Sequence, residues 1–525
     1  MTKVAIRVDA SVGMGTGHLR RCLSLAQALI DLGASVRLVC RLLDDVAPDL
    51  LRKLLCDVCW LPAPIAYAVD DDDADGLPLH HAWAQVPWRV DALQTCAALS
   101  AFEPDWLLVD HYAFDARWHT QVSSRLACQL AVLDDLADRQ IAADILIDHN
   151  WADSHSAKYA DALALSTKNT RILGGPNFAL LSAAYLNTAP YKFHSEVCSI
   201  GIFMGGTDPG RISEQVLDIC RHEFGFTGPV EVVSTSVNPH LTSLRLACGK
   251  SLNTTLTLDQ PHLADFFARH DLHIGAGGGA TWERCCMGVP SIVLVLQANQ
   301  LAVVPALVRL GVLKAAVMTT SPESDSDGLD GFAQPLAQVL RHLVQHPDIR
   351  YQLSVNAARL VDGQGAERVA LTLLGACLHL RPARLDDAAM LFAWRNHPQI
   401  RAVSIQTEPI AWEQHLRWIH SVLPDANRVL LVAEIASRAI GCIRFDLTDM
   451  MSATVSLYLD PSLQGLGLGR RMLLTGEQEL LARAGEVLLI KAQVSENNLA
   501  SQQMFVSCGY RGGPQFFQKT IHAYS

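Results

Sequence analysis

Short apolar runs alternate with helix-length segments along the first part of the chain. Residues 3–10 alternate as a buried strand does, a glycine-rich turn follows, and Leu19 to Leu29 have helical apolar spacing before a strand at Val36 to Cys40. Further short apolar runs follow at helix-length intervals, at Trp106 to Val109, Gln129 to Leu133 and Ile145 to Ile147. This order predicts a parallel sheet with helices on both faces.

A second series of the same kind begins after a polar stretch around Asn187 to Ser195, and the pattern changes again near Leu378. From there a helix over Asp387 to Asn396, an amphipathic helix around Trp412 to Val422 and several longer strands are typical of an α+β domain. The sequence therefore predicts three domains: two Rossmann-like α/β lobes over residues 1–190 and 191–377, and an α+β domain over 378–525. Ligands of two facing lobes are expected in the cleft between them.

Composition limits the classes of function. Half of the 525 residues are hydrophobic (50%) and 18% are charged, which excludes a disordered protein. The net charge of −11, without any lysine- or arginine-rich run, argues against nucleic-acid and anionic-membrane partners. The longest apolar stretches, such as Val289 to Leu296, are far shorter than the ~18 residues of a membrane span. We expect a cytoplasmic protein that acts on small molecules, because Arg7 and Asp9 also interrupt the first apolar run.

The 14 cysteines include one Cys-x-x-Cys pair, Cys56 and Cys59, but no second pair at the spacing of a zinc ribbon. Reduced, mostly buried thiols are expected, and no metal site is predicted.

The glycine-rich turn after the first strand ends in Gly17-His18-Leu19-Arg20. A dinucleotide-binding fingerprint would need its third glycine where His18 stands, so a nicotinamide cofactor is not expected. Glycines allow a ligand to approach the backbone at the start of a helix, and His18 would lie on the first helical turn, where it could take a proton from water. A structural role for His18 stays open at this point.

The second lobe repeats the order of strand, glycine-rich loop and helix at Gly275 to Arg284. Backbone N–H groups at such a helix start suit a diphosphate, and Glu283 could accept hydrogen bonds from ribose hydroxyls. Gly205-Gly206-Thr207-Asp208 forms a further turn suited to an anion, and Asn299-Gln300 follow another strand. Together these features predict a nucleotide site in the cleft.

Residues 1–375 carry a series of short motifs, in the order Ile6–Asp9, Gly17–Cys22, Val109–Tyr112, Leu133–Leu136, Gly174–Pro176, Phe203–Pro209 and Thr281–Cys285 with Asn299–Gln300. With these motifs in this order, the segment resembles the hydrolases of UDP-2,4-diacetamido-2,4,6-trideoxy-β-L-altropyranose in pseudaminic acid biosynthesis. The resemblance implies a fold of the glycosyltransferase-B type in which His18 activates water for attack at the anomeric carbon, with inversion and without a metal. It also implies that the substrate and its UDP group are held by Gly17, Arg20, Gly205, Gly206, Gly277, Gly278, Glu283 and Asn299. Asp110, His111 and Asp134 match family positions too, either as fold-holding residues or as substrate contacts.

The α+β domain carries Gln464-Gly465-Leu466-Gly467-Leu468-Gly469-Arg470 after a predicted strand. Successive amides in such a turn, at the start of a helix, can bind a pyrophosphate. With Asn498 and the final Gly509-Tyr510, this segment resembles the GNAT N-acetyltransferases, in particular those that acetylate UDP-4-amino-4,6-dideoxy-N-acetyl-β-L-altrosamine. The resemblance implies acetyl-CoA as co-substrate, held by Gln464, Gly465, Gly467, Gly469, Arg470 and Asn498. Many relatives have tyrosine as the acid for the CoA thiolate where this chain has Phe505.

The two resemblances reinforce each other because N-acetylation and removal of UDP are consecutive steps toward one sugar. The sequence therefore predicts a bifunctional enzyme whose substrates are acetyl-CoA and UDP-amino sugars. Two alternatives stay open: a glycosyltransferase that passes the sugar to an acceptor, and an acetyltransferase domain that binds ligands without catalysis.

Overall fold

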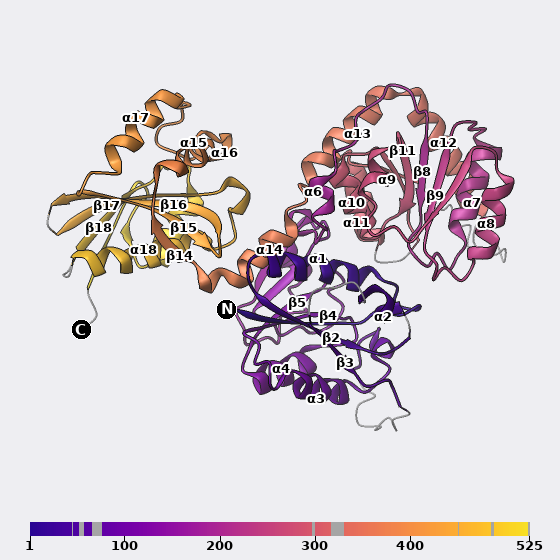
Figure 1. Ribbon diagram of the computed structural model, residues 1–525, viewed down its shortest axis with the longest axis horizontal. Helices are drawn as coiled ribbons and strands as arrows, with labels where there is room; N and C mark the ends of the chain where they lie inside the picture. The colour runs from indigo at the N-terminus through magenta and orange to yellow at the C-terminus, as the bar shows by residue number, and fades with distance from the viewer. Residues whose placement is uncertain are drawn as a thin grey trace. The chain divides into compact units, whose positions relative to one another are not determined.

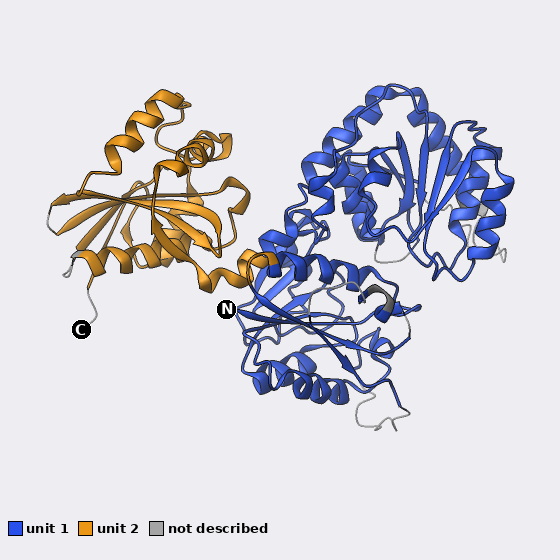
Figure 2. Ribbon diagram, viewed as in Figure 1, with its two compact units in different colours: residues 1–30, 34–369 blue, residues 31–33, 370–525 orange. Residues whose placement is uncertain are grey.

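The computed structural model describes residues 1–44, 46–51, 57–65, 76–296, 300–316, 330–449, 451–484 and 488–522. The chain forms two compact units, one of residues 1–30 and 34–369 and the other of residues 31–33 and 370–525 (Figure 2). The division falls within one helix, α14 (Gly365–Leu373). Each unit is described by itself below.

The first lobe of unit 1 is built on a parallel sheet with the strand order β3-β2-β1-β4-β5-β6-β7. Helix α1 covers one face of this sheet, and α3 and α4 cover the other (Figure 1). The strands are β1 (Lys3–Val8), β2 (Ser35–Arg41), β3 (Asp57–Leu61), β4 (Trp106–Asp110), β5 (Gln129–Leu133), β6 (Ile145–Asp148) and β7 (Arg171–Gly174). The helices are α1 (Gly17–Asp31), α2 (Val46–Leu51), α3 (Trp88–Leu99), α4 (Ala116–Leu126), α5 (His155–Lys158) and α6 (Ala184–Asn187), with short 3-10 turns η2 (His81–Ala84) and η3 (Pro176–Phe178).

The second lobe has a parallel sheet of the order β10-β9-β8-β11-β12-β13. Its strands are β8 (Ile200–Phe203), β9 (Val230–Ser234), β10 (Thr254–Leu258), β11 (Leu272–Ala276), β12 (Ser291–Leu294) and β13 (Lys314–Ala316). Its helices are α7 (Ile212–Asp218), the π-helical η4 (Ile219–Glu223), α8 (Leu241–Lys250), α9 (Ala264–Ala268), α10 (Ala280–Met287), α11 (Gln300–Arg309), α12 (Asp330–Gln345) and α13 (Pro347–Leu360). Helices α7 and α8 lie on one side of the sheet, opposite α9, α10 and α11 (Figure 1).

The two lobes of unit 1 share packed surface. Ala179, Leu181, Tyr185 and Tyr191 belong to the same hydrophobic cluster as the buried residues around α10. At the end of the second lobe, Nη1 of Arg368 on α14 donates to the carbonyl oxygen of Asn177 at 2.9 Å. The chain thus returns to the segment that links the lobes.

Unit 2 has a seven-stranded mixed sheet in the order β14-β15-β16-β17-β18-β20-β19. The strands are β14 (His379–Pro382), β15 (Arg428–Ile435), β16 (Arg438–Asp449), β17 (Ser452–Leu459), β18 (Leu488–Gln493), β19 (Arg511–Gly512) and β20 (Phe516–Ile521). Helix α18 (Leu468–Ala484) covers one face, and the opposite face carries α15 (Ala388–Asn396), α16 (Pro398–Ala402) and α17 (Trp412–Val422) (Figure 1). The remaining helical elements are α19 (Leu499–Ser507), η5 (Leu374–Cys377), η6 (Leu385–Asp387) and η7 (Pro461–Leu463).

Among the described residues of this sheet, β17 and β18 form the one parallel pair. β17 pairs with β16 from Ser452 to Leu459, but its pairing with β18 ends at Val455 opposite Ala492. In the part of the chain that the structure describes, the main chain of β17 beyond Val455 therefore has no strand partner on the β18 side. The expectation of two Rossmann-like α/β lobes followed by an α+β domain is confirmed.

Candidate functional site

His18 is the second residue of α1, beyond the carboxyl end of β1. Its Nδ1 lies 2.6 Å from Oδ1 of Asp110, the last residue of the neighbouring strand β4. Asp110 is fully buried and also accepts hydrogen bonds of 2.6 Å from both Nε and Nη2 of Arg21. Burial alone would raise the pKa of Asp110, but Arg21 and His18 outweigh it and hold that pKa well below its usual range. Asp110 is therefore a carboxylate that orients His18.

The contact with Asp110 decides which nitrogen of His18 is basic. Nδ1 also lies 3.1 Å from Nη2 of Arg21, but that nitrogen already donates to Asp110 at the shorter distance of 2.6 Å. An ionised carboxylate only accepts hydrogen bonds, so the 2.6 Å contact between Asp110 and Nδ1 is satisfied by a hydrogen on Nδ1. The lone pair of the neutral ring then lies on Nε2. The geometry thus leaves Nε2 as the nitrogen of His18 that can accept a hydrogen bond.

Aromatic rings surround His18. The ring of Tyr112 meets it edge to face at a centroid distance of 4.7 Å, and that of Trp83 does so at 5.9 Å. His80 in turn contacts both Trp83 and Tyr112, at 4.7 Å and 5.6 Å. These rings come from residues 80–83 and from the loop after β4, so two distant segments form an aromatic wall beside the His18 ring.

A hydrogen-bonded chain leads from this wall to the second lobe. The hydroxyl of Tyr112 donates to Asp135, whose other oxygen accepts from Nδ2 of Asn150 at 2.9 Å. Oδ1 of Asn150 accepts from Nε1 of Trp282 at 3.1 Å, and Trp282 lies on α10. The first turn of α10 is thereby tied to the strand ends around His18.

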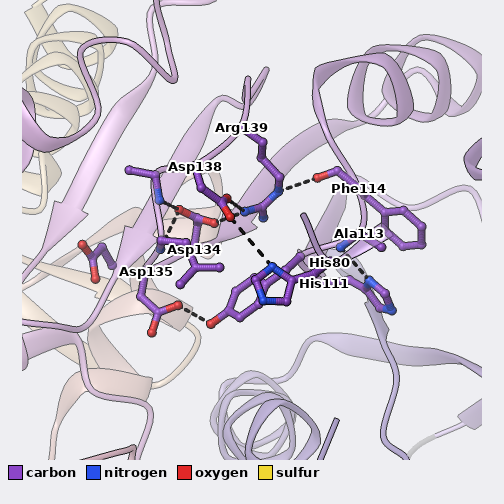
Figure 3. A network of polar contacts seen from close by, with 12 residues as sticks. His80, His111, Ala113, Phe114, Asp134, Asp135, Asp138 and Arg139 are labelled. Carbon is purple, nitrogen blue, oxygen red and sulfur yellow. Dashed lines mark hydrogen bonds and ion pairs between the residues drawn. The ribbon is translucent and has the colours of Figure 1, made fainter. Parts of the chain in front are cut away.

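Asp134 and His111 hold the fold. Asp134 pairs with Nη1 of Arg139 at 2.5 Å and accepts from two backbone amides of its own loop (Figure 3). Nδ1 of His111 accepts from the amide of Ala113, and its Nε2 lies 3.2 Å from the fully buried Asp9. Burial lowers the pKa of His111, so this ring is neutral.

The glycines before α10 have two different surroundings. A Cβ atom on Gly277 would lie 3.0 Å from Oε1 of Gln300 and 3.0 Å from Cγ2 of Val304, so Gly277 permits close packing of α11. A Cβ atom on Gly278 would meet no atom within 4 Å. The amides of Thr281 and Trp282 donate to the carbonyl oxygens of Gly278 and Gly279 at 2.9 Å and 3.0 Å, so the open space lies beside the glycine loop that precedes these amides.

Glu283 lies on the first turn of α10, within hydrogen-bond range of the Tyr185 hydroxyl and in the field of Arg20. Burial raises the pKa of Glu283, while Tyr185 and Arg20 oppose that rise. The Tyr185 hydroxyl also accepts from the amide of Leu263 at 3.2 Å. Arg20 reaches across from α1 and donates to the carbonyl oxygen of Pro261 at 3.2 Å. The structure thus brings Arg20 and Glu283, predicted separately, into one cluster.

The loop after β8 adds a further edge of the same region. Gly205 has φ +101°, and a Cβ atom on Gly206 would lie 3.3 Å from Cγ2 of Thr235 and 3.8 Å from Oγ1 of Thr16 in the first lobe. Asp208 turns away from this space, because its carboxylate accepts from the amides of Ile212 and Ser213. The two glycines rather than the acid therefore border the region between the lobes.

Gly17 and Asn299 are the two remaining residues predicted to bind the substrate or UDP. Gly17 is the first residue of α1, and a Cβ atom there would meet nothing within 4 Å. Asn299 lies outside the described residues.

His149, which follows β6 and lies against Arg21, was not predicted as a site residue. Its Nε2 is 3.5 Å from Nη1 of Arg21, and Nδ1 is buried with no hydrogen-bond partner in the described part of the chain. Burial and Arg21 lower the pKa of His149 to about 4, so the ring is neutral. A lone histidine after an apolar strand has no spacing signature; only the convergence of parallel strand ends brings it to His18.

In unit 2 the predicted acetyl-CoA loop joins η7 to α18. Gly465 and Gly467 have φ of +77° and +68°, so the turn needs glycine at both positions. A Cβ atom on Gly469 would lie 3.2 Å from the sulfur of Met504, where α18 packs against α19. Gln464 and Arg470 are exposed on either side of the helix start. This loop leads into the amino end of a 17-residue helix, where the amide of Arg471 donates to the carbonyl oxygen of Gly467 at 3.4 Å.

Asn498 and Phe505 have structural contacts at the other end of this region. Oδ1 of Asn498 caps α19 by accepting from the amide of Ser501, and its Nδ2 donates to the carbonyl oxygen of Val403. Phe505 is buried, with its ring 4.9 Å from that of Tyr510 and 5.9 Å from that of Phe517. The Phe505 side chain is part of a hydrophobic core and offers no proton donor.

In the part of the chain that the structure describes, no group of three or more His, Cys, Asp or Glu side chains could hold a metal ion. Within the same ranges, none of the helices combines the length and apolarity needed to cross a bilayer.

Residues 378–511 match the model of the acetyltransferase (GNAT) domain family. The C-terminal unit is a GNAT acetyltransferase domain. Acetyltransferase PseH of Campylobacter jejuni is 28% identical over 120 residues, 23% of this chain and 74% of that protein. Spore coat polysaccharide biosynthesis protein SpsG of Bacillus subtilis is 24% identical over 278 residues, 51% of this chain and 76% of that protein. An uncharacterized protein of Methanocaldococcus jannaschii, MJ1062, is 21% identical and covers 97% of this chain and 96% of its own length.

Proposed function

We propose that the chain is a bifunctional enzyme of pseudaminic acid biosynthesis. The GNAT domain transfers an acetyl group from acetyl-CoA to the 4-amine of UDP-4-amino-4,6-dideoxy-N-acetyl-β-L-altrosamine. The two N-terminal lobes hydrolyse the product, UDP-2,4-diacetamido-2,4,6-trideoxy-β-L-altropyranose, to UDP and the free sugar. The orientation of His18 by Asp110 is the observation that carries the hydrolytic half, since it leaves Nε2 as a base.

The acetyl-transfer half is supported by the fold of unit 2 and by its similarity to PseH. The glycine-rich loop before α18 presents backbone N–H groups to the pyrophosphate of CoA. Beyond Val455, unpaired main chain of β17 offers hydrogen-bonding groups to an extended ligand. Holding the thioester and the amine together supplies much of the rate of such a transfer.

The hydrolytic half follows from the chemistry available at the strand ends of unit 1. The oxygen of a water molecule forms a bond to the anomeric carbon while its proton moves to Nε2 of His18. The bond from that carbon to the diphosphate oxygen breaks, and its electron pair leaves with UDP. Amide groups at the start of α10 and the guanidinium of Arg20 would stabilise the charge on the diphosphate.

Attack from the face opposite UDP predicts inversion, so the free sugar is first released as the opposite anomer. Hydrolysis in ¹⁸O-labelled water tests the step directly: the label should appear in the sugar and not in UDP. Proton NMR taken within the first minutes should show the inverted anomer.

Label in UDP would mean cleavage at phosphorus and would contradict the role given to His18. Release of sugar only when a hydroxyl acceptor is added would instead favour the glycosyltransferase.

A further inference from the structure

The acetyltransferase domain needs a proton donor that Phe505 cannot supply. When an amine displaces CoA, the C–S bond breaks and the sulfur leaves as a thiolate, which is protonated by an acid in the site. Phe505 has no hydroxyl and is buried against Tyr510 and Phe517. The proton for the CoA thiolate must therefore come from another side chain, near the half of β17 that has no β18 partner within the described residues.

Tyr458 lies in that unpaired half. It is three residues beyond Val455, where the pairing of β17 with β18 ends, and it stands opposite Cys442 on β16. Its ring packs with the cluster that contains Leu391, Trp394 and Ile419 from α15 and α17. Tyr458 is thus on the face of the sheet that carries α15 and α17, opposite to the face covered by α18.

The surroundings of the Tyr458 ring suit a phenol that gives up a proton and takes one back. The side chain is half-buried, its hydroxyl interacts with the thiol of Cys442, and Arg395 and Arg444 lie within electrostatic range. Burial raises the pKa of Tyr458, so the phenol is protonated at neutral pH, and both guanidinium groups favour the transient phenolate.

Arg395 adds an independent observation. Its Nη2 donates to the carbonyl oxygen of Gln406 at 2.8 Å, but its buried Nη1 has no hydrogen-bond partner in the described residues. An unpartnered buried donor costs free energy unless a ligand satisfies it. The neighbourhood of Tyr458 therefore contains a donor that a substrate oxygen can satisfy.

Tyr510 and Glu434 are held in ion-paired clusters. The hydroxyl of Tyr510 donates to the buried Glu477 at 2.8 Å, and Glu477 also pairs with Lys519. Glu434 is held by Nε of Arg381 at 2.8 Å. Tyr458 differs from both because it lies on the unpaired half of β17 and its hydroxyl faces a neutral thiol.

We propose that Tyr458 is the catalytic acid of acetyl transfer and that Arg395 binds an oxygen of the amino-sugar nucleotide beside it. The assignment rests on the proposed acetyltransferase function. The amine nitrogen bonds to the thioester carbon, the C–S bond breaks, and the electron pair goes to sulfur. The sulfur takes the hydroxyl proton of Tyr458, and the phenolate recovers a proton from the ammonium group formed on the attacking nitrogen.

The test compares Tyr458→Phe with Ser421→Ala in the full chain, since Ser421 is exposed on α17 and its hydroxyl donates to the carbonyl oxygen of Trp418 in its own helix. Steady-state acetylation of the UDP-4-amino sugar is measured at neutral pH. Tyr458→Phe should lower kcat by about 10²-fold and change both KM values less than about threefold. Ser421→Ala should leave kcat within about twofold.

The outcomes separate this assignment from the proposed function. An unchanged kcat in Tyr458→Phe overturns the role of Tyr458 while acetyl transfer by the unaltered chain stands. Absence of acetyl transfer by the unaltered chain overturns the proposed function and the assignment together. A KM for the amino-sugar nucleotide that is unchanged in Arg395→Ala overturns the binding role of Arg395.

Discussion

Replacing His18 with glutamine should abolish most of the hydrolysis while leaving the fold intact. The amide nitrogen of a glutamine can still donate to Asp110, but the side chain has no basic nitrogen. Asp110 keeps both hydrogen bonds from Arg21, so the buried carboxylate stays paired. The change therefore removes the base without leaving an uncompensated charge.

The size of the effect follows from what the base contributes. General-base catalysis is typically worth 10²- to 10⁴-fold, or about 3–5 kcal/mol of activation free energy at about 1.4 kcal/mol per factor of ten. At most, loss of one hydrogen bond to a charged group costs about 1.5–3 kcal/mol of folding stability. We expect kcat for UDP release to fall at least 10²-fold.

The assay follows UDP release from the synthetic diacetamido substrate, with UDP affinity measured by calorimetry. His222→Gln is the matched control, because His222 is 76% exposed and lies on η4 in the second lobe. The Kd for UDP should change less than about twofold in both variants, since no UDP contact is assigned to either histidine. Unchanged turnover in His18→Gln would refute the role of His18 as base.

Three further predictions concern other parts of the chain. Gly278→Ala should weaken UDP binding at least tenfold, because the added Cβ would enter the space proposed for the diphosphate. Tm should change little, since that Cβ meets no protein atom within 4 Å. Calorimetry measures the UDP affinity and thermal unfolding measures Tm; an unchanged UDP affinity would contradict the prediction. Gly465→Ala should weaken acetyl-CoA binding, because Gly465 has φ +77° and alanine in this left-handed conformation costs about 1–2 kcal/mol of backbone strain. An unchanged Kd for acetyl-CoA would argue against this loop as its binding site. Burial lowers the pKa of His119 to about 3, so the folded protein resists protonation of this ring. The free energy of unfolding that this neutral ring supports is present above the pKa of an unfolded histidine, near 6.5, and is lost as the pH falls toward 3. His119→Gln should reduce the slope of the free energy of unfolding against pH in this range by about 1.4 kcal/mol per pH unit, measured by hydrogen exchange of β5 amides. An equal slope in both proteins would exclude His119 as the cause.

Much of the fold could be predicted because its strands are short apolar runs with clear boundaries. The helix expected over Trp412 to Val422 is α17 with the same bounds, and the strand expected at Val36 to Cys40 is β2 extended by one residue at each end. Strands such as β3 and β10 escaped prediction because they are edge strands with exposed, partly polar positions. The alternation of apolar and polar residues that reveals a strand is weakest in edge strands, because their side chains are only partly buried.

The site was predictable where chemistry is local in sequence and not where it depends on tertiary contacts. Glycine loops and His18 have fixed spacing to the strand before them, so these residues could be proposed from the sequence, and their roles stay predictions. Trp83, Tyr185 and His149 escaped prediction, because their positions depend on which strand ends converge. The role of Asp110 was ambiguous until its contact with His18 was seen. The proposed UDP role of Asn299 stays a prediction, since that residue lies outside the described ranges.

Mass spectrometry of the full chain incubated with UDP-4-amino-4,6-dideoxy-N-acetyl-β-L-altrosamine, with and without acetyl-CoA, tests the bifunctional assignment most directly. The account predicts UDP and the free diacetamido sugar only when acetyl-CoA is present, with the acetylated UDP-sugar accumulating in His18→Gln. Substrate that is unchanged in the presence of acetyl-CoA would contradict the account.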